Sequence, residues 1–542
     1  MKILFAALHN GDYRNLDSVI DALARRGHDL YLGAERPDTR FGGQPIVEQL
    51  TARYPNISCG PVPPREPESL FLASKVRLGG DYLRYLHPRY PRTSGLLPMA
   101  RERTPTGIVR LCGLRAFDNE PVRRMLRRSL DAMDRAVPPS PAIEAFLDER
   151  RPDAVVITPL IGLAATSQPD LLRAAIARRI PTAVIIWSWD NLSSKAIIRD
   201  VPDALLVWNE TQRWEATAMH GVPAERVVVT GVQNLDRWFG RAPSRTRAEF
   251  SRAAGLDDDR PYAMWVCSAL LPSSPPEPQV VLRWLDAVRQ SPDPALRDVP
   301  ILIRPHPART HEWDGVDWRR FGNITMFGTV PVDEASRTDF FDSMYYAGAV
   351  VGITTTAFLD AAVVGRPVMS FYDPGLTFEH EDSLHFQYLL KAEGGLLTMG
   401  ASLEEHTRQL AAMLAGPPPG VMERQAHFVQ QFVRPRGMDV PATAAVVEAL
   451  ERLQSAGSLR GGASAFGRLA LRVLAAIENH PRWRMLVLDE REAETATRVH
   501  EKAGRRAEAL ARKARQREEK ARRREEKERK SSRAGKSSRL RI

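Results

Sequence analysis

The sequence has few cysteines and no long apolar run. Its three cysteines, Cys59, Cys112 and Cys267, are far apart and odd in number, which argues against a disulfide framework or a cysteine zinc site. No stretch approaches the roughly 20 apolar residues that a membrane-spanning helix requires. The opening apolar run, MKILFAAL, is too short for the core of a signal peptide. We therefore expect a cytoplasmic protein, at most peripheral to the inner face of the plasma membrane.

The excess positive charge of the chain is confined to its C-terminal end. The 542 residues carry a formal net charge of +11. Residues 491–542 contain 20 Lys and Arg against 9 Asp and Glu, and the rest of the chain contains 57 of each sign. Residues 457–542 are predicted to form a charged tail, helical or disordered, with too little apolar surface to join a core. Three uses of this tail stay open: contact with anionic membrane lipid, contact with nucleic acid, which is the least favoured, and simple solubilisation.

Two α/β domains are predicted in front of this tail. Short β-branched runs alternate with helical segments from residue 1 to Gly240 and again from about residue 262, which is typical of parallel sheets. We expect an N-terminal domain at 1–240 and a C-terminal domain at 241–456, both Rossmann-like and facing a common cleft. In the first helix, four apolar residues share one face and a glycine suits its end: Leu16, Val19, Ile20, Leu23 and Gly27.

A basic helical insertion is predicted at residues 61–141 of the first domain. It is rich in Arg and Tyr, so it could face anionic lipid, an anionic acceptor or nucleic acid. The more favoured alternative is a solvated helical insertion whose arginine stems cover apolar surface.

Two motifs in the second domain predict an anion site. In ILIRPHPA (301–308), a buried strand delivers Arg304 and His306 into an extended turn between prolines. In VVGITTTAFLDAAVVGRPV (350–368), a strand leads into three threonines, Thr354, Thr355 and Thr356, and then into a helix from about Ala357. The first turn of a helix offers unpaired backbone N–H groups and a positive dipole end. Asp360, one turn further, could accept hydrogen bonds from ribose hydroxyls, or it is an ordinary first-turn residue.

With these motifs the chain resembles two-domain GT-B glycosyltransferases, and more narrowly the CDP-glycerol glycerophosphotransferase and capsule-polysaccharide transferase group. That group carries a similar Arg-x-His-Pro turn and a Ser/Thr-rich turn before a helix ending in Gly-(Lys/Arg)-Pro-Val. In this sequence, Gly365 to Val368 match the Gly-(Lys/Arg)-Pro-Val ending. The resemblance implies that His306 and the threonine turn bind the phosphate of a nucleotide-activated donor.

Two residues after strands of the first domain are candidates for the base that accepts the proton of an acceptor hydroxyl, His9 and Asp190. The segment Trp189 to Lys195 resembles the Trp-His-Gly-x-x-x-Lys turn of the same group, with Asp190 at the position of the histidine. Asp190 could equally act as the cap of the next helix, and His9 could simply bond its own turn.

Five further residues are expected near the cleft: Asp12, Lys195, Gly231, Glu379 and His380. Asp12 is a less favoured candidate base. Glu379 and His380 could reach the sugar or base of the nucleotide, or they belong to an ordinary surface loop, which is slightly favoured. No metal and no cofactor is predicted, because Arg304, His306 and the helix start can carry the phosphate charge. A Gly-x-x-x-x-Gly-Lys-Ser/Thr loop is missing, which argues against a P-loop NTPase.

The sequence therefore predicts metal-independent transfer of a glycosyl or polyol-phosphate unit from a nucleotide-activated donor to a hydroxyl of a cell-envelope or capsule glycan. The acceptor would be a glycan or a lipid-linked glycan. A nucleotide-sugar 2-epimerase of the same fold is the first alternative. The second is a non-catalytic scaffold for envelope assembly that acts through its basic tail.

Overall fold

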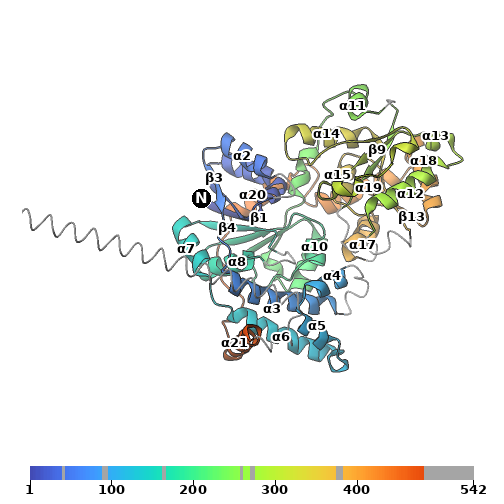
Figure 1. Cartoon of the computed structure of the whole chain (residues 1–542). Helices are drawn as coiled ribbons and strands as arrows, with labels where there is room; N and C mark the ends of the chain where they lie inside the picture. The colour runs from blue at the N-terminus through green and yellow to red at the C-terminus, as the bar shows by residue number, and fades with distance from the viewer. Residues whose placement is uncertain are drawn as a thin grey trace, which may run out of the picture.

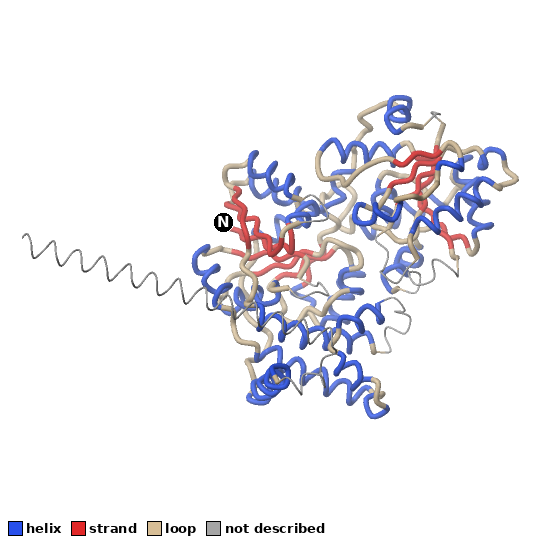
Figure 2. The backbone as a smooth tube through the Cα atoms, viewed as in Figure 1, coloured by secondary structure: helices blue, strands red, loops and turns tan. Residues whose placement is uncertain are grey.

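The computed structural model describes residues 1–38, 43–87, 96–160, 166–256, 260–268, 275–373 and 383–480. They form two α/β domains, each with one parallel sheet, as Figures 1 and 2 show. The predicted fold class of two Rossmann-like domains is confirmed. Within these residues, no helix combines the length and the apolar character needed to cross a membrane.

The first sheet has seven parallel strands in the order β3-β2-β1-β4-β5-β6-β7. Its strands are β1 (Lys2–His9), β2 (Asp29–Arg36), β3 (Ile57–Pro61), β4 (Ala154–Thr158), β5 (Thr182–Ile185), β6 (Ala204–Val207) and β7 (Val227–Val229). The accompanying helices are α1 (Asp17–Arg25), α2 (Gln44–Arg53), α7 (Pro141–Arg150), α8 (Gln168–Ala177), α9 (Asn191–Ser194) and α10 (Glu210–Trp214). The predicted helical face is confirmed, because Leu16, Val19, Ile20 and Leu23 are fully buried. Gly27 ends that turn with φ of +82°, a conformation that glycine adopts without strain.

The second sheet has six parallel strands in the order β10-β9-β8-β11-β12-β13. Its strands are β8 (Tyr262–Val266), β9 (Ile301–Arg304), β10 (Ile324–Met326), β11 (Ala347–Val351), β12 (Val368–Phe371) and β13 (Thr398–Gly400). Its helices are α11 (Arg247–Ala254), α12 (Glu277–Arg289), α13 (Pro294–Arg297), α14 (Glu334–Tyr345), α15 (Ala357–Val363), α17 (Leu384–Lys391), α18 (Leu403–Ala415) and α19 (Val421–Phe428). In each sheet the second and third strands of the domain lie on one side of its first strand, and the later strands lie on the other side. The strand order therefore reverses at β1/β4 and at β8/β11. Ligands of open α/β sheets bind at the carboxyl ends of the strands beside such a point.

The chain crosses between the domains twice, and both crossings are held by specific contacts. A short 3-10 turn, η5 (Gln233–Trp238), leads out of the first domain. Helix α20 (Ala442–Glu451) returns and buries Val446, Val447 and Leu450 in the core of the first domain. The carboxylate of Asp236 joins the two crossings, since it accepts hydrogen bonds from the amides of Ala442 and Thr443 at 3.2 and 2.7 Å.

The basic insertion forms a helical layer of its own. It consists of α3 (Pro67–Tyr85), α4 (Leu96–Arg103), α5 (Thr106–Cys112) and α6 (Glu120–Ala136), with a small apolar core. Several of its arginines are buried and paired rather than solvated: Arg77 contacts Asp134 and Asp170 at 2.8 and 2.7 Å. The guanidinium of Arg84 donates to the carbonyl oxygen of Lys195 at 3.0 Å. The insertion therefore supports the loop that follows β5.

The segment after Gly457 differs from the expectation of a tail without core contacts. Helix α21 (Ala465–Asn479) packs against α6 and buries Leu471 in the core of the insertion. In front of it, Arg460 forms ion pairs with Asp134 at 2.9 Å and with Asp200 at 3.1 Å. A narrow apolar stripe and one arginine are enough to dock this segment on a surface that is itself acidic and apolar. Residues 481–542 of the predicted tail lie outside the described residues.

Candidate functional site

A cavity of about 180 Å³ lies between the two domains, at the carboxyl ends of β8 and β9 and at the turn after β11. The second domain contributes Val266, Cys267, Arg304 to Pro307, Thr329, Pro331, Phe340, Thr355 to Ala357 and Asp360. The first domain and the crossing contribute Arg14, Asn15, Asn234, Arg237 and Trp238. The cavity is therefore at the strand-order reversal of the second sheet, where a ligand is expected.

Arg304 is the last residue of β9 and is almost completely buried at this cavity. Its Nη2 donates to the carbonyl oxygen of Thr329 at 2.8 Å, and its guanidinium lies over the ring of Phe340 at 4.6 Å. Its Nη1 has no hydrogen-bond partner among the residues that the structure describes. Burial lowers the pKa of Arg304 to about 10, although Asp339, Tyr262 and Asp360 oppose this. A buried cationic donor without an acceptor at a cavity wall is suited to an anion.

The close approach of the main chain at Gly328 makes room for this guanidinium. A Cβ atom at Gly328 would lie 2.1 Å from Nη1 of Arg304, and the residue has φ of +101°. Only glycine fits there without displacing the arginine.

His306 lies in the turn after β9, two residues beyond Arg304, and lines the same cavity. Burial, together with the neighbouring Arg14 and Arg309, lowers its pKa to about 4. The imidazole is therefore neutral near pH 7. A phosphate placed between His306 and these arginines would favour the protonated imidazole and raise its pKa.

Two of the three predicted threonines, Thr355 and Thr356, line the cavity, and Thr354 does not. The amide of Thr354 donates to the Ser268 hydroxyl at 3.2 Å, which ties the turn to the end of β8. Helix α15 has only seven residues, and the amide of Ala357 already donates to the Thr355 hydroxyl oxygen at 3.3 Å. The backbone of this turn thus offers fewer open donors than the sequence suggested, so Arg304 is a stronger candidate than this turn for contacting an anion.

Asp360, the predicted ribose ligand, also lines the cavity, but its carboxylate contacts the protein. The indole N–H of Trp238 donates to Asp360 Oδ1 at 2.6 Å. Burial raises the pKa of Asp360 to about 6, against the lowering effect of Trp238 and Arg237. Because Trp238 belongs to the interdomain crossing and Asp360 to α15, this hydrogen bond joins the crossing to the second domain at the cavity wall.

Arg14 is a cavity residue that the sequence reasoning missed. It lies in the 3-10 turn η1 (Asn10–Asn15) directly after β1, and it lines the cavity from the first domain. Burial lowers its pKa, while Asp12 and Asp38 raise it. Its position after the first strand of a Rossmann-like sheet was the available signal. The cavity therefore carries cations from both domains.

His9 and Asp12 lie at the beginning of the same turn. Nδ1 of His9 is 3.6 Å from Oδ1 of Asp12. The carboxylate of Asp12 is anchored, since Oδ2 accepts the amide N–H groups of Leu8 and His9 at 3.2 and 3.3 Å. Burial raises the pKa of Asp12, and His9 opposes this. His9 thus lies beside a fixed carboxylate, at a distance longer than a hydrogen bond, and it does not line the cavity.

Asp190, the other candidate base, is held as an ion. Its Oδ2 is 2.9 Å from Nζ of Lys195, and the hydroxyl of Ser188 donates to Oδ1 at 2.6 Å. Burial by itself would raise its pKa, but Lys195, His385 and Ser188 outweigh it and keep the pKa far below its ordinary value. A carboxylate that ionises so readily is a weak base, so Asp190 and Lys195 are better suited to orienting a polar group.

A second group of interdomain residues surrounds Asp190. The hydroxyl of Tyr388, on α17 of the second domain, donates to Oε1 of Glu215 at 3.0 Å. The ring of His385, on the same helix, packs edge-on against Trp189 at 5.2 Å. Glu215 opens the π-helical turn η3 (Glu215–Met219) and is fully buried, which raises its pKa to about 8. Glu215 is therefore a neutral acid near pH 7.

The remaining predicted cleft residues are placed as follows. Gly231 has φ of +90° at the crossing between the domains, where a Cβ would lie 3.0 Å from the carbonyl oxygen of Val433. It makes room for the second crossing and lies outside the cavity lining. Glu379 and His380 lie outside the described residues.

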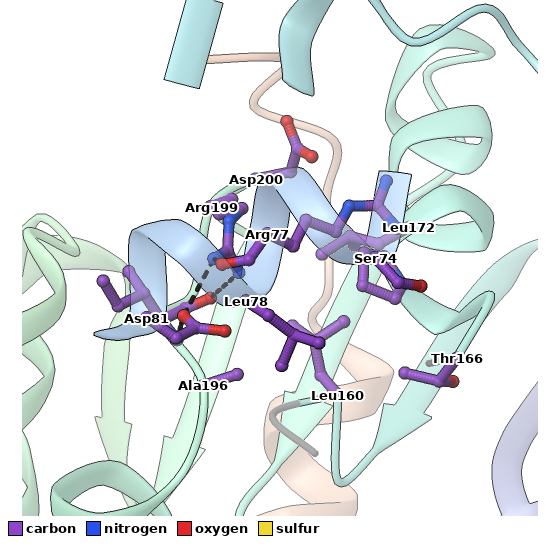
Figure 3. A pocket seen from close by; sticks show the side chains of 12 residues that line it. Ser74, Arg77, Leu78, Asp81, Leu160, Thr166, Leu172, Ala196, Arg199 and Asp200 are labelled. Carbon is purple, nitrogen blue, oxygen red and sulfur yellow. Dashed lines mark hydrogen bonds and ion pairs between the residues drawn. The ribbon is translucent and has the colours of Figure 1, made fainter. Parts of the chain in front are cut away.

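A smaller cavity inside the first domain is structural. Figure 3 shows its lining, with Arg199 reaching Asp81 at 2.8 Å. Its volume of about 30 Å³ is about that of one water molecule. It is too small for a nucleotide. A third cavity, of about 310 Å³, lies at the amino ends of β1, β2 and β3, whereas the interdomain cavity lies at the carboxyl ends of strands, where ligands of such sheets bind, and is therefore the candidate site. Across the described residues, no three His, Cys, Asp or Glu side chains form a group that could hold a metal ion.

Comparisons with known proteins add structural resemblance only. No family model matches the chain, and no curated protein matches it. Solved structures that resemble it include UDP-GlcNAc 2-epimerase from Neisseria meningitidis bound to UDP-GlcNAc, with 12% identity over 83% of this chain and 100% of that chain and a TM-score of 0.47. The calicheamicin glycosyltransferase CalG4 has 11% identity over 83% and 97%, with a TM-score of 0.43. A variant of the wall teichoic acid polymerase TagF has 9% identity over 83% and 88%, with a TM-score of 0.42. At such values these similarities carry no argument about function, which rests on the chain's own geometry.

The neutral state of Glu215 is testable through stability. Its pKa is about 8 in the folded protein against an ordinary value of 4.5. The favourable contribution of this group is complete below pH 4.5 and is lost as the pH rises to about 8, because the unfolded chain ionises first. The free energy of unfolding of the Glu215→Gln variant should fall less steeply over this window, by up to about 1.4 kcal/mol per pH unit. Denaturant unfolding at a series of pH values measures it. Equal slopes for both proteins would show that Glu215 is ionised.

Proposed function

We propose that the protein is a metal-independent transferase of GT-B-like architecture. It moves a glycosyl or polyol-phosphate unit from a nucleotide-activated donor to a hydroxyl of a cell-envelope or capsule glycan. The observation that carries the proposal is the cavity-lining residue Arg304, which is buried and whose Nη1 has no hydrogen-bond partner among the described residues. Burying a cationic donor without an acceptor is costly, and a donor phosphate would supply that acceptor.

In the proposed reaction the acceptor oxygen attacks the transferred unit, and the bond to the leaving phosphate breaks. With a glycosyl donor, the C1–O bond breaks and a nucleoside diphosphate leaves. With a polyol-phosphate donor such as CDP-glycerol, a P–O bond of the diphosphate breaks and a nucleoside monophosphate leaves. The electron pair stays on the leaving phosphate oxygen in both cases. Arg304, His306 and Arg14 would stabilise that charge, which is the usual role of preorganised donors.

His9 is the proposed base for the acceptor hydroxyl. It ends β1 next to the turn that carries Arg14, and Asp12 lies 3.6 Å from its Nδ1. On taking up the acceptor proton, the imidazolium would be stabilised by the Asp12 carboxylate. Asp190 is not favoured for this role, because Lys195 and Ser188 hold it ionised.

Substitution of Arg304 should raise stability while it removes donor binding. In Arg304→Met the buried charge is gone, so we expect the free energy of unfolding to rise by about 1–3 kcal/mol. Affinity for nucleoside diphosphates should fall roughly 10- to 150-fold. Thermal unfolding with and without UDP, CDP and GDP measures both effects.

Arg289→Met is the matched control for this variant. Arg289 donates to the carbonyl oxygens of Phe321, Arg297 and Val299 at 2.8, 2.8 and 2.9 Å, so its loss should destabilise the fold without changing nucleotide affinity. If Arg304→Met instead bound nucleotides like the wild type, the cavity would not be a phosphate site.

Donor binding should take up a proton at His306. Its pKa of about 4 without ligand would rise beside a diphosphate, so the affinity should increase as the pH falls from 8 towards 5. The ligand for this titration is a nucleotide sugar, because its diphosphate diester keeps its charge in this range. Calorimetry in buffers of different ionisation enthalpy counts the protons. The His306→Gln variant should show no pH dependence of this kind, and an unchanged profile in that variant would remove His306 from the site.

Measuring turnover distinguishes the proposed base from the residues that bind the donor. We expect His9→Gln to lower nucleotide release in the presence of an envelope glycan fraction by about 10²- to 10⁴-fold, with donor affinity unchanged. His28→Gln is the control, since His28 pairs with Glu451 at 3.0 Å, in the turn between α1 and β2. Formation of an epimer from a nucleotide sugar without any acceptor would favour the 2-epimerase over the transferase.

A further inference from the structure

Large apolar side chains are exposed together on helix α21. Phe466, Leu469 and Val473 are 57%, 63% and 49% exposed. Their spacing of three and four residues places them on one helical face. The other face carries Gly467, Leu471 and Leu474, which pack against the insertion. The helix is therefore apolar on two sides, and only one side is covered within the described part of the chain.

The neighbouring helix α6 also carries an exposed apolar residue beside basic ones. Helices α6 and α21 lie side by side at the end of the first domain away from the second domain (Figure 1). Met125 of α6 is 61% exposed, and the exposed Arg124 and Arg128 lie together on one side of it. On α21 the exposed Arg468 and Arg472 lie along one edge of the apolar face. The α6–α21 surface, defined by these residues, is thus apolar with a basic border.

The contacts before α21 fix this surface to the folded body. Arg460 pairs with Asp134 and Asp200 at 2.9 and 3.1 Å, and these carboxylates also bind Arg173 at 2.8 and 2.9 Å. The N-cap hydroxyl of Ser464 accepts the amide of Gly467 at 3.0 Å. The apolar face is therefore held outward by contacts on its opposite side. Beyond α21, residues 491–542 carry the whole net charge of +11.

We propose that the α6–α21 surface docks on an anionic lipid bilayer. Phe466, Leu469 and Val473 would enter the boundary between headgroups and acyl chains, and the bordering arginines would bind lipid phosphate. Charge complementarity selects this partner, because the surface and the sequence beyond it are basic. Nucleic acid is less well matched: it offers phosphate but no apolar layer for Leu469 and Val473. This inference is independent of the proposed transfer reaction.

Vesicle sedimentation with the full chain tests the proposal. Vesicles of phosphatidylglycerol and phosphatidylcholine should bind the protein, and pure phosphatidylcholine vesicles should bind it far less. The triple variant Phe466→Ser, Leu469→Ser, Val473→Ser keeps every charge. It should bind anionic vesicles at least about tenfold more weakly, since the apolar contribution is lost. The remaining binding should disappear at high salt.

The control replaces two exposed apolar residues of the second domain, Met438→Ser and Val440→Ser, which should leave vesicle binding unchanged. Circular dichroism and thermal unfolding confirm that all variants fold. Vesicle binding of the triple variant equal to that of the wild type would overturn the proposal. A lipid-independent dimer that the triple variant abolishes would also overturn it, because a second copy would then cover the surface. Preferential binding of RNA over anionic vesicles is the third outcome against it.

Discussion

The burial of Arg304 at the carboxyl edge of the second sheet is the interaction on which the candidate site depends. Strand β9 and its turn carry Arg304 and His306 to the crevice, and Gly328 leaves the space that the guanidinium needs. The protein satisfies Nη2 with a carbonyl oxygen and leaves Nη1 without a partner among the described residues. Burying Nη1 without an acceptor lowers the stability of the fold, and a ligand that supplies this acceptor binds more favourably.

The contacts between the domains determine which residues of the first domain lie near Arg304. Asp236 caps the returning helix α20, and Asp17 of α1 contacts Arg237 at 2.7 Å and also Arg337 of the second domain. Trp238 binds Asp360 and stacks on Phe341. These contacts bring Arg14 of the first domain to the cavity, so that Arg14 and Arg304, two cations from different domains, border it. Around Asp190, Glu215 and Tyr388 form a second connection between the domains.

The sheet architecture and half of the cavity could be predicted from the sequence. Buried parallel strands leave long apolar, β-branched runs, and the polar residues that follow them must lie at one edge, as Arg304, His306, Thr355 and Asp360 do. The strands β3 (ISCGP) and β13 (TMG) gave no such signal because they are short and contain glycine or proline. The partners of the site could not be predicted either. Trp238 meets Asp360 across 122 positions and Tyr388 meets Glu215 across 173, and no local pattern encodes such pairs.

The docked part of the C-terminal segment shows the same limit. Averaged over residues 457–542 the composition is polar and basic, which favours a solvated tail. Nevertheless, Arg460 pairs with two buried carboxylates and Leu471 packs into the apolar core beside α6. Composition describes an average, whereas docking depends on a few residues at the right spacing.

The structure of the protein bound to the nucleoside diphosphate that stabilises it most is the most direct test of the account. We predict that phosphate oxygens lie within hydrogen-bond distance of Arg304 Nη1 and of the His306 imidazole, with Arg14 approaching from the first domain. A nucleotide bound elsewhere, for example with its phosphates at Lys195 and Asp190, would contradict the account, as would a cavity that stays without phosphate at saturating nucleotide.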